Sequence, residues 1–467
     1  MALLSNNHSK NIIYTLSPGL ISIFITFFSI PIFLNYVDNN IYADYLIKHF
    51  LLTISTILSL QFGKISSIKM QLINSKHKND FVLTSIFFSI MIGIVFSCII
   101  FFIINIIFKN FNLIKIDFSI LVGFAITIIY INLEYIGRGL GFFKATSFTN
   151  LIFYSISISL PGIMIVTELK RDLLINNLFN ISLIIKIVSL ILLIIALFNK
   201  ELFFNAKIKL KLINKFIFHS KWMTITAVYN QIYEYLDKHL IKIFMGPSML
   251  IIYSVPQQIA AKLSIISNAI ISVILPKLSS LKILNQKKII FSANLYMFIY
   301  VIGLSLLIIL PFLEYILKWW LEDGYQQEML YLLKLFLLLT FFGSCSNIIV
   351  TLYETNSIEK KNTILETYSI FPFLISLSLC VYFKNIFYFA IVLLLKELIL
   401  LFIRINEIKK YIINFKYLII QFVLFNLIFL FNLYKNNFIV YLLILMLIIL
   451  TVFNFPLKII KNEFKKK

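Results

Sequence analysis

Residues 81–108 read FVLTSIFFSIMIGIVFSCIIFFIINIIF, a run of apolar and small polar residues without a single charged side chain. A helix that crosses a bilayer needs about 20 predominantly apolar residues. A helix also satisfies its own backbone hydrogen bonds, which is required where no water is present. The run therefore predicts a membrane-spanning helix, and it is longer than a single crossing requires.

The same composition extends along most of the chain. Of its 467 residues, 60% are hydrophobic and only 13% are charged, and the mean hydropathy is +0.95. Soluble domains carry about 25% charged residues, so this composition excludes a soluble globular protein. No stretch is long and polar enough to form a separate domain, which argues against an enzyme with a soluble catalytic domain. We therefore expect an all-α integral membrane protein.

Windows of about 19 apolar residues predict 12–14 transmembrane helices, of which we prefer fourteen. The first apolar run, residues 12–34, lacks the small-residue cleavage pattern of a signal peptide, so we expect it to be retained as a span. The predicted spans are 12–34, 42–63, 81–108, 118–137, 146–167, 173–198, 217–241, 249–275, 289–311, 329–352, 363–383, 386–403, 417–433 and 438–456.

The charge balance reports the orientation in the membrane. The chain has 42 Lys and Arg residues against 20 Asp and Glu, a formal net charge of +22. Most of these cations fall in alternate loops, above all in 64–80 and 199–216, and in the C-terminal tail. Because basic loops stay in the cytoplasm, we expect both termini there, and no nucleic-acid partner is needed to explain the charge. The three cysteines have neither disulfide nor metal-site spacing.

A short internal repeat indicates a duplicated architecture. Residues 64–68 read KISSI and residues 277–281 read KLSSL, each at the end of a predicted span. Transporters are commonly built from such repeats. We therefore expect two six-helix lobes, a linker and an appended pair of helices. The expected ranges are 1–198 for the N-terminal lobe, 199–216 for a basic cytoplasmic linker, 217–404 for the C-terminal lobe, and 405–467 for two additional transmembrane helices and a basic cytoplasmic tail.

Ionisable residues inside predicted spans are the candidate functional groups, because burying a charge in a membrane is costly unless a partner or a cavity compensates it. No motif for nucleotide binding, metal hydrolysis or nucleophilic catalysis is present. Lys262 is the strongest candidate, since it lies too deep to reach an interface, and His49 stands at the equivalent repeat position. The cationic candidates are Lys48, His49, Lys186, Lys221 and Lys262.

The acidic candidates leave two roles open. Glu234 and Asp237, next to Lys238, could bind a coupling ion or could simply balance the charge of Lys238. Glu134 and Arg138 have the spacing of a structural i,i+4 pair, and Lys396 with Glu397 forms a second compensated pair.

Several of these residues lie in stretches that resemble a known family. The sequences YLDKHLI (235–241), IYSVP (252–256) and PKLS (276–279), with Gly246, resemble the seventh and eighth helices of bacterial polysaccharide flippases. These are the Wzx-type O-antigen translocases of the multidrug/oligosaccharidyl-lipid/polysaccharide exporter superfamily. The second predicted span and the connection from Trp320 to Asn356 resemble the same family. The chain departs from it at Asn40 and Asp44, where glycines are common, and in using Lys where the family has lumenal Arg.

The resemblance implies two pseudo-symmetric lobes around a central cavity that opens alternately to each face of the bacterial inner membrane. The substrate would be an undecaprenyl-diphosphate-linked oligosaccharide, bound by a cationic cavity, with H⁺ or Na⁺ as the coupling ion and no cofactor. Membrane lipids and other polysaccharide-assembly proteins would be the partners. Two alternatives stay open: a membrane polysaccharide polymerase or ligase of the same pathway, which the short outer loops disfavour, and a drug or cation antiporter, which the basic candidates disfavour.

Overall fold

The computed structural model describes most of the chain up to residue 413. The described residues are 6–53, 55, 59, 62–70, 75–109, 118–166, 177–197, 207–208, 210–281, 283–356 and 358–413. Every regular element among them is helical, so the all-α prediction is confirmed. The two C-terminal spans predicted at 417–433 and 438–456 lie outside the described residues.

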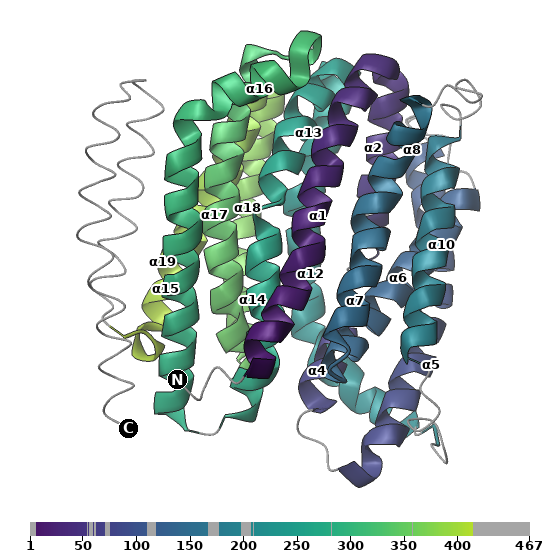
Figure 1. The fold of residues 1–467 in the computed structure, drawn as a ribbon, viewed down its shortest axis with the longest axis vertical. Coiled ribbons are helices and arrows are strands. Elements are labelled where there is room, and N and C mark those ends of the chain that lie inside the picture. Colours follow the sequence, from purple (N-terminus) through teal and green to yellow (C-terminus); the bar gives the residue numbers. More distant parts are fainter. Residues whose placement is uncertain are drawn as a thin grey trace. The chain divides into compact units, whose positions relative to one another are not determined.

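The helices form two compact units, named here unit 1 and unit 2 (Figure 1). Unit 2 comprises Lys10–Val255 and Ser357–Phe389, and unit 1 comprises Met1–Ser9, Pro256–Asn356 and Ala390–Lys467. The expected lobe boundaries at 198 and 217 are not tested by this division and stay a prediction.

Unit 2 is built from helices of the N-terminal half together with one helix from much later in the chain. That helix, α18, packs on α12. Tyr233 on α12 donates a hydrogen bond to the Glu366 carbonyl (3.0 Å), and Thr363 donates to the Trp222 carbonyl (3.0 Å). The helices are α1 (Asn6–Tyr36), α2 (Asn39–Thr53), α4 (Phe62–Met70), α5 (Ser75–Lys109), α6 (Phe118–Gly139), α7 (Phe143–Asn150), the π-helix η1 (Leu151–Ile156), α8 (Ser157–Val166), α10 (Leu178–Leu197), α12 (Leu210–Met245), the first part of α13 (Pro247–Ala261) and α18 (Glu359–Phe383).

Unit 1 is organised around α17, which contacts α14, α15 and α16. Its helices are α14 (Ser264–Ser280), α15 (Leu284–Ile309), the 3₁₀ turn η2 (Leu310–Phe312), α16 (Leu313–Leu321), the 3₁₀ turn η3 (Glu322–Gly324), α17 (Gln327–Thr355), α19 (Ile386–Glu407) and the 3₁₀ turn η4 (Lys409–Tyr411).

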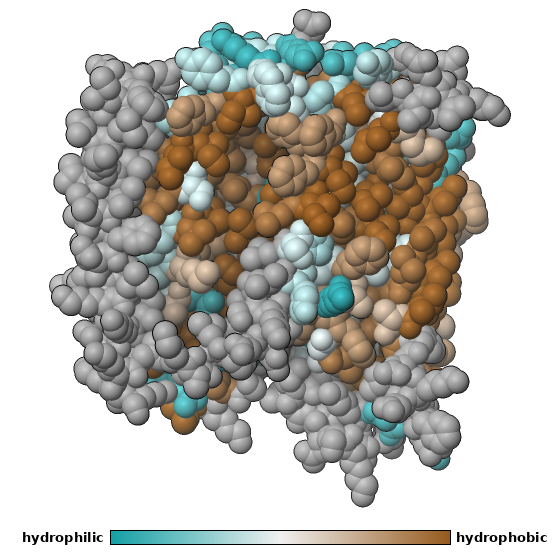
Figure 2. All heavy atoms as spheres, viewed as in Figure 1, coloured by the Kyte–Doolittle hydropathy of each residue, from teal (hydrophilic) through white to brown (hydrophobic). Residues whose placement is uncertain are grey.

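Ten helical segments of the described part are long and apolar enough to cross a membrane. They correspond to ten of the predicted spans. Among the residues that Figure 2 colours, hydrophobic side chains cover most of the face drawn, and hydrophilic residues are most numerous at its upper edge. Of the span predicted at 42–63, the structure describes α2 to Thr53 and α4 from Phe62, and most residues between these two helices lie outside the described residues. The span predicted at 217–241 lies within α12, which is helical throughout and includes the charged residues Lys221, Glu234, Asp237 and Lys238. The total of fourteen spans is not confirmed.

Candidate functional site

His49 lies buried on α2, facing α10. Its ring makes edge contacts with Tyr45 at 4.6 Å and with Phe179 at 5.5 Å between ring centroids. Its Nε2 lies 3.3 Å from the Ser182 hydroxyl. The neighbouring Lys48 is half-buried and places its ammonium 5.5 Å from the centre of the Phe179 ring. Two predicted cationic residues therefore border the same part of α10.

Lys186 follows Ser182 by one helical turn on the same buried face of α10. Only 4% of the residue is exposed. Its ammonium lies 4.6 Å from the centre of the Phe153 ring, within the range of a cation–π interaction. Among the described residues no carboxylate forms an ion pair with Lys186. The described structure gives this buried ammonium an aromatic ring and no carboxylate, and an anion could compensate its charge, which is otherwise costly to bury.

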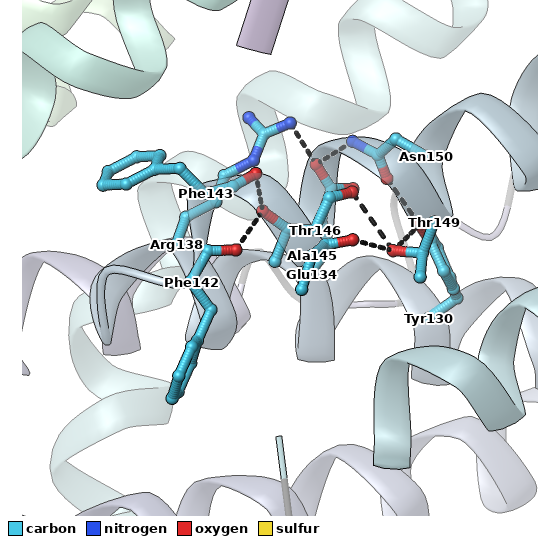
Figure 3. Close-up of polar contacts among 9 residues, drawn as sticks. All are labelled: Tyr130, Glu134, Arg138, Phe142, Phe143, Ala145, Thr146, Thr149 and Asn150. Carbon is cyan, nitrogen blue, oxygen red and sulfur yellow. Dashed lines mark hydrogen bonds and ion pairs between the residues drawn. The ribbon is translucent and has the colours of Figure 1, made fainter. Parts of the chain in front are cut away.

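The Phe153 ring packs beside a polar network that joins α6 to α7, which Figure 3 shows. Phe153 stacks on Tyr130 with ring centroids 3.8 Å apart. The Tyr130 hydroxyl donates to the Asn150 side-chain oxygen at 2.6 Å, and the Asn150 amide donates to Glu134 at 2.6 Å. From α10, the Ser189 hydroxyl donates to the Thr149 carbonyl at 2.8 Å.

Glu134 ends this network in an ion pair with Arg138, at 2.5 Å. The structure agrees with the predicted i,i+4 pair and adds Asn150 and Tyr130, which the sequence reasoning missed. Asn150 could have been found, because an amide inside a predicted span needs a buried partner. The network leads directly into the π-helix η1, and such irregular turns recur at functional sites.

The Asp237 carboxylate is completely buried on α12, where it accepts two hydrogen bonds and lies beside an ammonium group. The Tyr253 hydroxyl donates to Oδ2 at 2.5 Å, and the Lys238 backbone N–H donates to Oδ1 at 2.7 Å. The Lys238 ammonium lies 3.6 Å from Oδ1. The same ammonium lies 5.0 Å and 4.9 Å from the ring centres of Phe50 and Tyr235. This arrangement is that of a charge-balanced buried pair.

Helix α2 connects the surroundings of Lys186 and Lys238, since it contacts both α10 and α12. Successive residues face the two neighbours: His49 approaches α10, and the Phe50 ring lies 5.7 Å from the Tyr235 ring on α12. At the start of α2, Asp44 forms an ion pair with Lys242 of α12.

The structure distributes the predicted cationic residues unevenly. It brings Lys48, His49 and Lys186 together around α10. Lys221 is exposed on α12, with its ammonium 5.2 Å from the centre of the Trp222 ring. Lys262 belongs to unit 1 and is half-buried. The side chain of Glu234 lies outside the described part of the structure.

Lys262 sits where the helix is interrupted. It forms a turn with Leu263 between α13 and α14, closed by hydrogen bonds that join residues three apart, such as the Lys262 N–H to the Ile259 carbonyl at 3.1 Å. Interrupted helices of this kind often build the binding sites of transporters. The sequence predicted a single span over 249–275, in which Pro256 permits a bend, but no Gly or Pro stands at the turn itself.

Unit 1 has its own buried charge cluster, at the contact of α17 and α19. Glu397 forms ion pairs with Lys396 at 3.2 Å and with Arg404 at 3.8 Å. Arg404 also donates to the Ser346 hydroxyl. The predicted Lys396–Glu397 pair is confirmed, and Arg404 completes it with a second positive charge.

Comparison with known proteins agrees with this architecture. A Shigella flexneri protein named for a proposed role as an O-antigen transporter is 26% identical over 166 residues, which cover 35% of this chain and 39% of that relative. A transporter of the MOP superfamily from Pyrococcus furiosus has the same fold, with a TM-score of 0.65 at 11% identity, over 88% of this chain and 98% of its own. The lipid II flippase MurJ in an inward closed conformation matches with a TM-score of 0.60 at 17% identity, over 94% and 98%. Residues 9–282 match the family described as polysaccharide biosynthesis protein. The chain belongs to that polysaccharide biosynthesis family.

Proposed function

We propose that this protein is a flippase that moves undecaprenyl-diphosphate-linked oligosaccharide repeat units across the bacterial inner membrane by alternating access. Its family membership and its fold, shared with a lipid II flippase, support a transporter of lipid-linked precursors. The basic loops support an orientation with both termini in the cytoplasm.

Lys186 is the observation that carries the proposal. A buried ammonium without a carboxylate partner in the described structure favours an anionic substrate, and the diphosphate is the anionic part of a lipid-linked sugar. An antiporter of drugs or cations would need the opposite polarity at this position. A polymerase or ligase of this pathway would be expected to carry a large outer loop with catalytic residues, whereas the predicted outer loops of this chain are short.

The residues around Lys186 define separate tasks in binding. The ammonium of Lys186, with Lys48 at the edge, replaces the hydration of the phosphate oxygens by charge-assisted hydrogen bonds. The Ser182 hydroxyl and the His49 ring add neutral hydrogen bonds to the same oxygens. The Phe153 ring holds the ammonium in place when no anion is bound.

Asp237 and Lys238 have a structural role and do not bind the substrate. Their mutual compensation supports a charge-balancing role that holds α12 against α13, because Tyr253 of α13 donates to the same carboxylate. Coupling to H⁺ or Na⁺ remains part of the proposed function, with Glu234 as its acidic candidate.

The proposal is tested in cells that lack the protein, by extracting the polyprenyl-linked sugars and determining which leaflet holds them. Complete repeat units trapped in the cytoplasmic leaflet, and released by the wild-type gene, support a flippase. Single units that reach the outer surface without polymerising would identify a polymerase instead. An unchanged lipid pool with unchanged surface glycan would contradict both and favour the antiporter.

A further inference from the structure

The helices α15 and α16 form one apolar segment that is too long for a single crossing. The segment Leu284–Leu321 has 38 residues, which as one straight helix would be about 57 Å long at about 1.5 Å per residue. The hydrocarbon core is about 30 Å thick. The 26 residues of α15 alone already reach about 39 Å, so α16 has no hydrocarbon left to cross.

The chain bends between the two helices. Pro311 lies within the 3₁₀ turn η2, where its missing N–H and fixed φ interrupt the regular hydrogen bonds. Figure 1 shows α15 running through unit 1 and α16 turning aside at its end. The short helix α16 nevertheless keeps an ordered place, because it packs against α17.

The nine residues of α16 present three distinct faces. One face is buried and consists of Leu313, Leu317, Trp320 and Leu321. A second is polar, where Lys318 and Glu314 form an ion pair at 2.8 Å with both side chains largely exposed. The third is aromatic: Tyr315 is 76% exposed and Trp319 is 74% exposed, one helical turn apart.

The aromatic face continues the exposed apolar face of α15. Exposed residues follow each other along α15 in steps of three or four, and the same steps pass the bend into α16. This exposed stripe consists of Met297, Val301, Ser305, Ile308, Phe312, Ile316 and Trp319. In a protein whose α15 crosses the bilayer, the stripe faces lipid, so the rings at its end meet the level where hydrocarbon gives way to headgroups.

We propose that α16 is an interfacial helix that lies in the headgroup region at one face of the bilayer, with Tyr315 and Trp319 among the lipids. Tyr and Trp rings gather at this level because each has an apolar body and a polar atom. The Glu314–Lys318 pair points to the aqueous side of the same region. A helix seated in this way fixes the depth of α15 and opposes its tilting or sliding along the membrane normal.

The experiment uses tryptophan fluorescence of the full-length protein in vesicles of brominated phosphatidylcholine. The chain has three tryptophans, so Trp222→Phe with Trp320→Phe leaves Trp319 as the single reporter. We expect bromines near the headgroup end of the acyl chain to quench Trp319 about twofold more than bromines near its middle. The control is Val301→Trp in a protein without the native tryptophans, where the deep bromines should quench more.

A second pair of variants keeps the test valid if the variant with Trp319 as its single tryptophan folds poorly. If Trp320→Phe reduces the yield of folded protein, the difference between Trp222→Phe and Trp222→Phe/Trp319→Phe reports Trp319 alone. The buried Trp320, which is 8% exposed, should be quenched less than Trp319 by every lipid. The proposal is overturned if aqueous iodide quenches Trp319 and neither lipid does. Protection from all quenchers would also overturn it, because another protein surface would then cover α16. Either result leaves the proposed flippase activity untouched.

Discussion

Two lysines of unit 2 share almost every property except one. Lys186 on α10 and Lys238 on α12 are both buried, with 4% and 3% of the residue exposed, and both place their ammonium over aromatic rings. Lys238 also has the Asp237 carboxylate at 3.6 Å. Lys186 has no ion pair with any carboxylate in the described structure. The difference separates a charge that the fold compensates from a charge that we propose the substrate compensates.

The largest expected effect comes from removing the ammonium of the compensated pair. Lys238→Met leaves Asp237 buried next to Tyr253 without its counter-charge, and breaking a buried pair in this way costs about 3–5 kcal/mol. We expect a large loss of thermal stability of the purified protein in detergent, measured by the temperature at which it aggregates. The double variant Lys238→Met/Asp237→Leu should recover most of the loss. A single variant as stable as the wild type would contradict the charge-balancing role.

Exchanging Lys186 for Met should reduce transport without reducing the stability of the protein. Lys186→Met removes a desolvated charge that no carboxylate of the described structure compensates, so stability should be unchanged or increased. Loss of the charge-assisted contact to the substrate diphosphate should reduce transport at least about tenfold, which corresponds to about 1.4 kcal/mol. The measurement is the rate at which surface glycan appears at matched protein levels. Normal transport by Lys186→Met would remove Lys186 from the site.

The pair also shows what the sequence could and could not predict. Both lysines were recognisable, because each is a charged residue inside a predicted span. The sequence showed only part of the difference between them. Asp237 is adjacent to Lys238 in the chain, but Tyr253 and Phe50, which also contact this pair, belong to other helices. The surroundings of Lys186 were not predictable, since Ser182 meets His49 across 133 residues of sequence.

The helices themselves followed from apolar runs, but their grouping did not. The helix α18 joins α12 through hydrogen bonds such as Thr363 to the Trp222 carbonyl, and no period in the sequence encodes that choice of partner. The interruption at Lys262 was missed for a related reason. Helix breaks are predicted from Gly or Pro, and here the turn follows Pro256 at a distance of six residues.

A smaller effect is expected from a neutral neighbour of Lys186. Ser182→Ala removes the hydroxyl that lies 3.3 Å from His49, and a hydrogen bond of this kind contributes about 0.5–1.5 kcal/mol. We expect transport to fall a few-fold, with the apparent affinity for substrate changing more than the maximal rate. Ser376→Ala is the matched control, because the Ser376 hydroxyl on α18 donates to the Pro372 carbonyl of its own helix. Equal effects of both variants would show that Ser182 has no special part in binding.

The smallest effect is expected from an ion pair that is exposed. It tests whether an ion pair stabilises this protein only when its charged groups are buried. Asp44 and Lys242 join α2 to α12 by an ion pair, as Asp237 and Lys238 are joined within α12, but the Asp44 side chain is 55% exposed. Exposed pairs contribute about 0–1 kcal/mol because water and salt screen them. Asp44→Asn should therefore change the thermal stability little, and added salt should abolish even that change. A loss as large as that of Lys238→Met would mean that α2 is held in place by its charges. His49 would then owe its position beside Lys186 to Asp44 rather than to the rings of Tyr45 and Phe179.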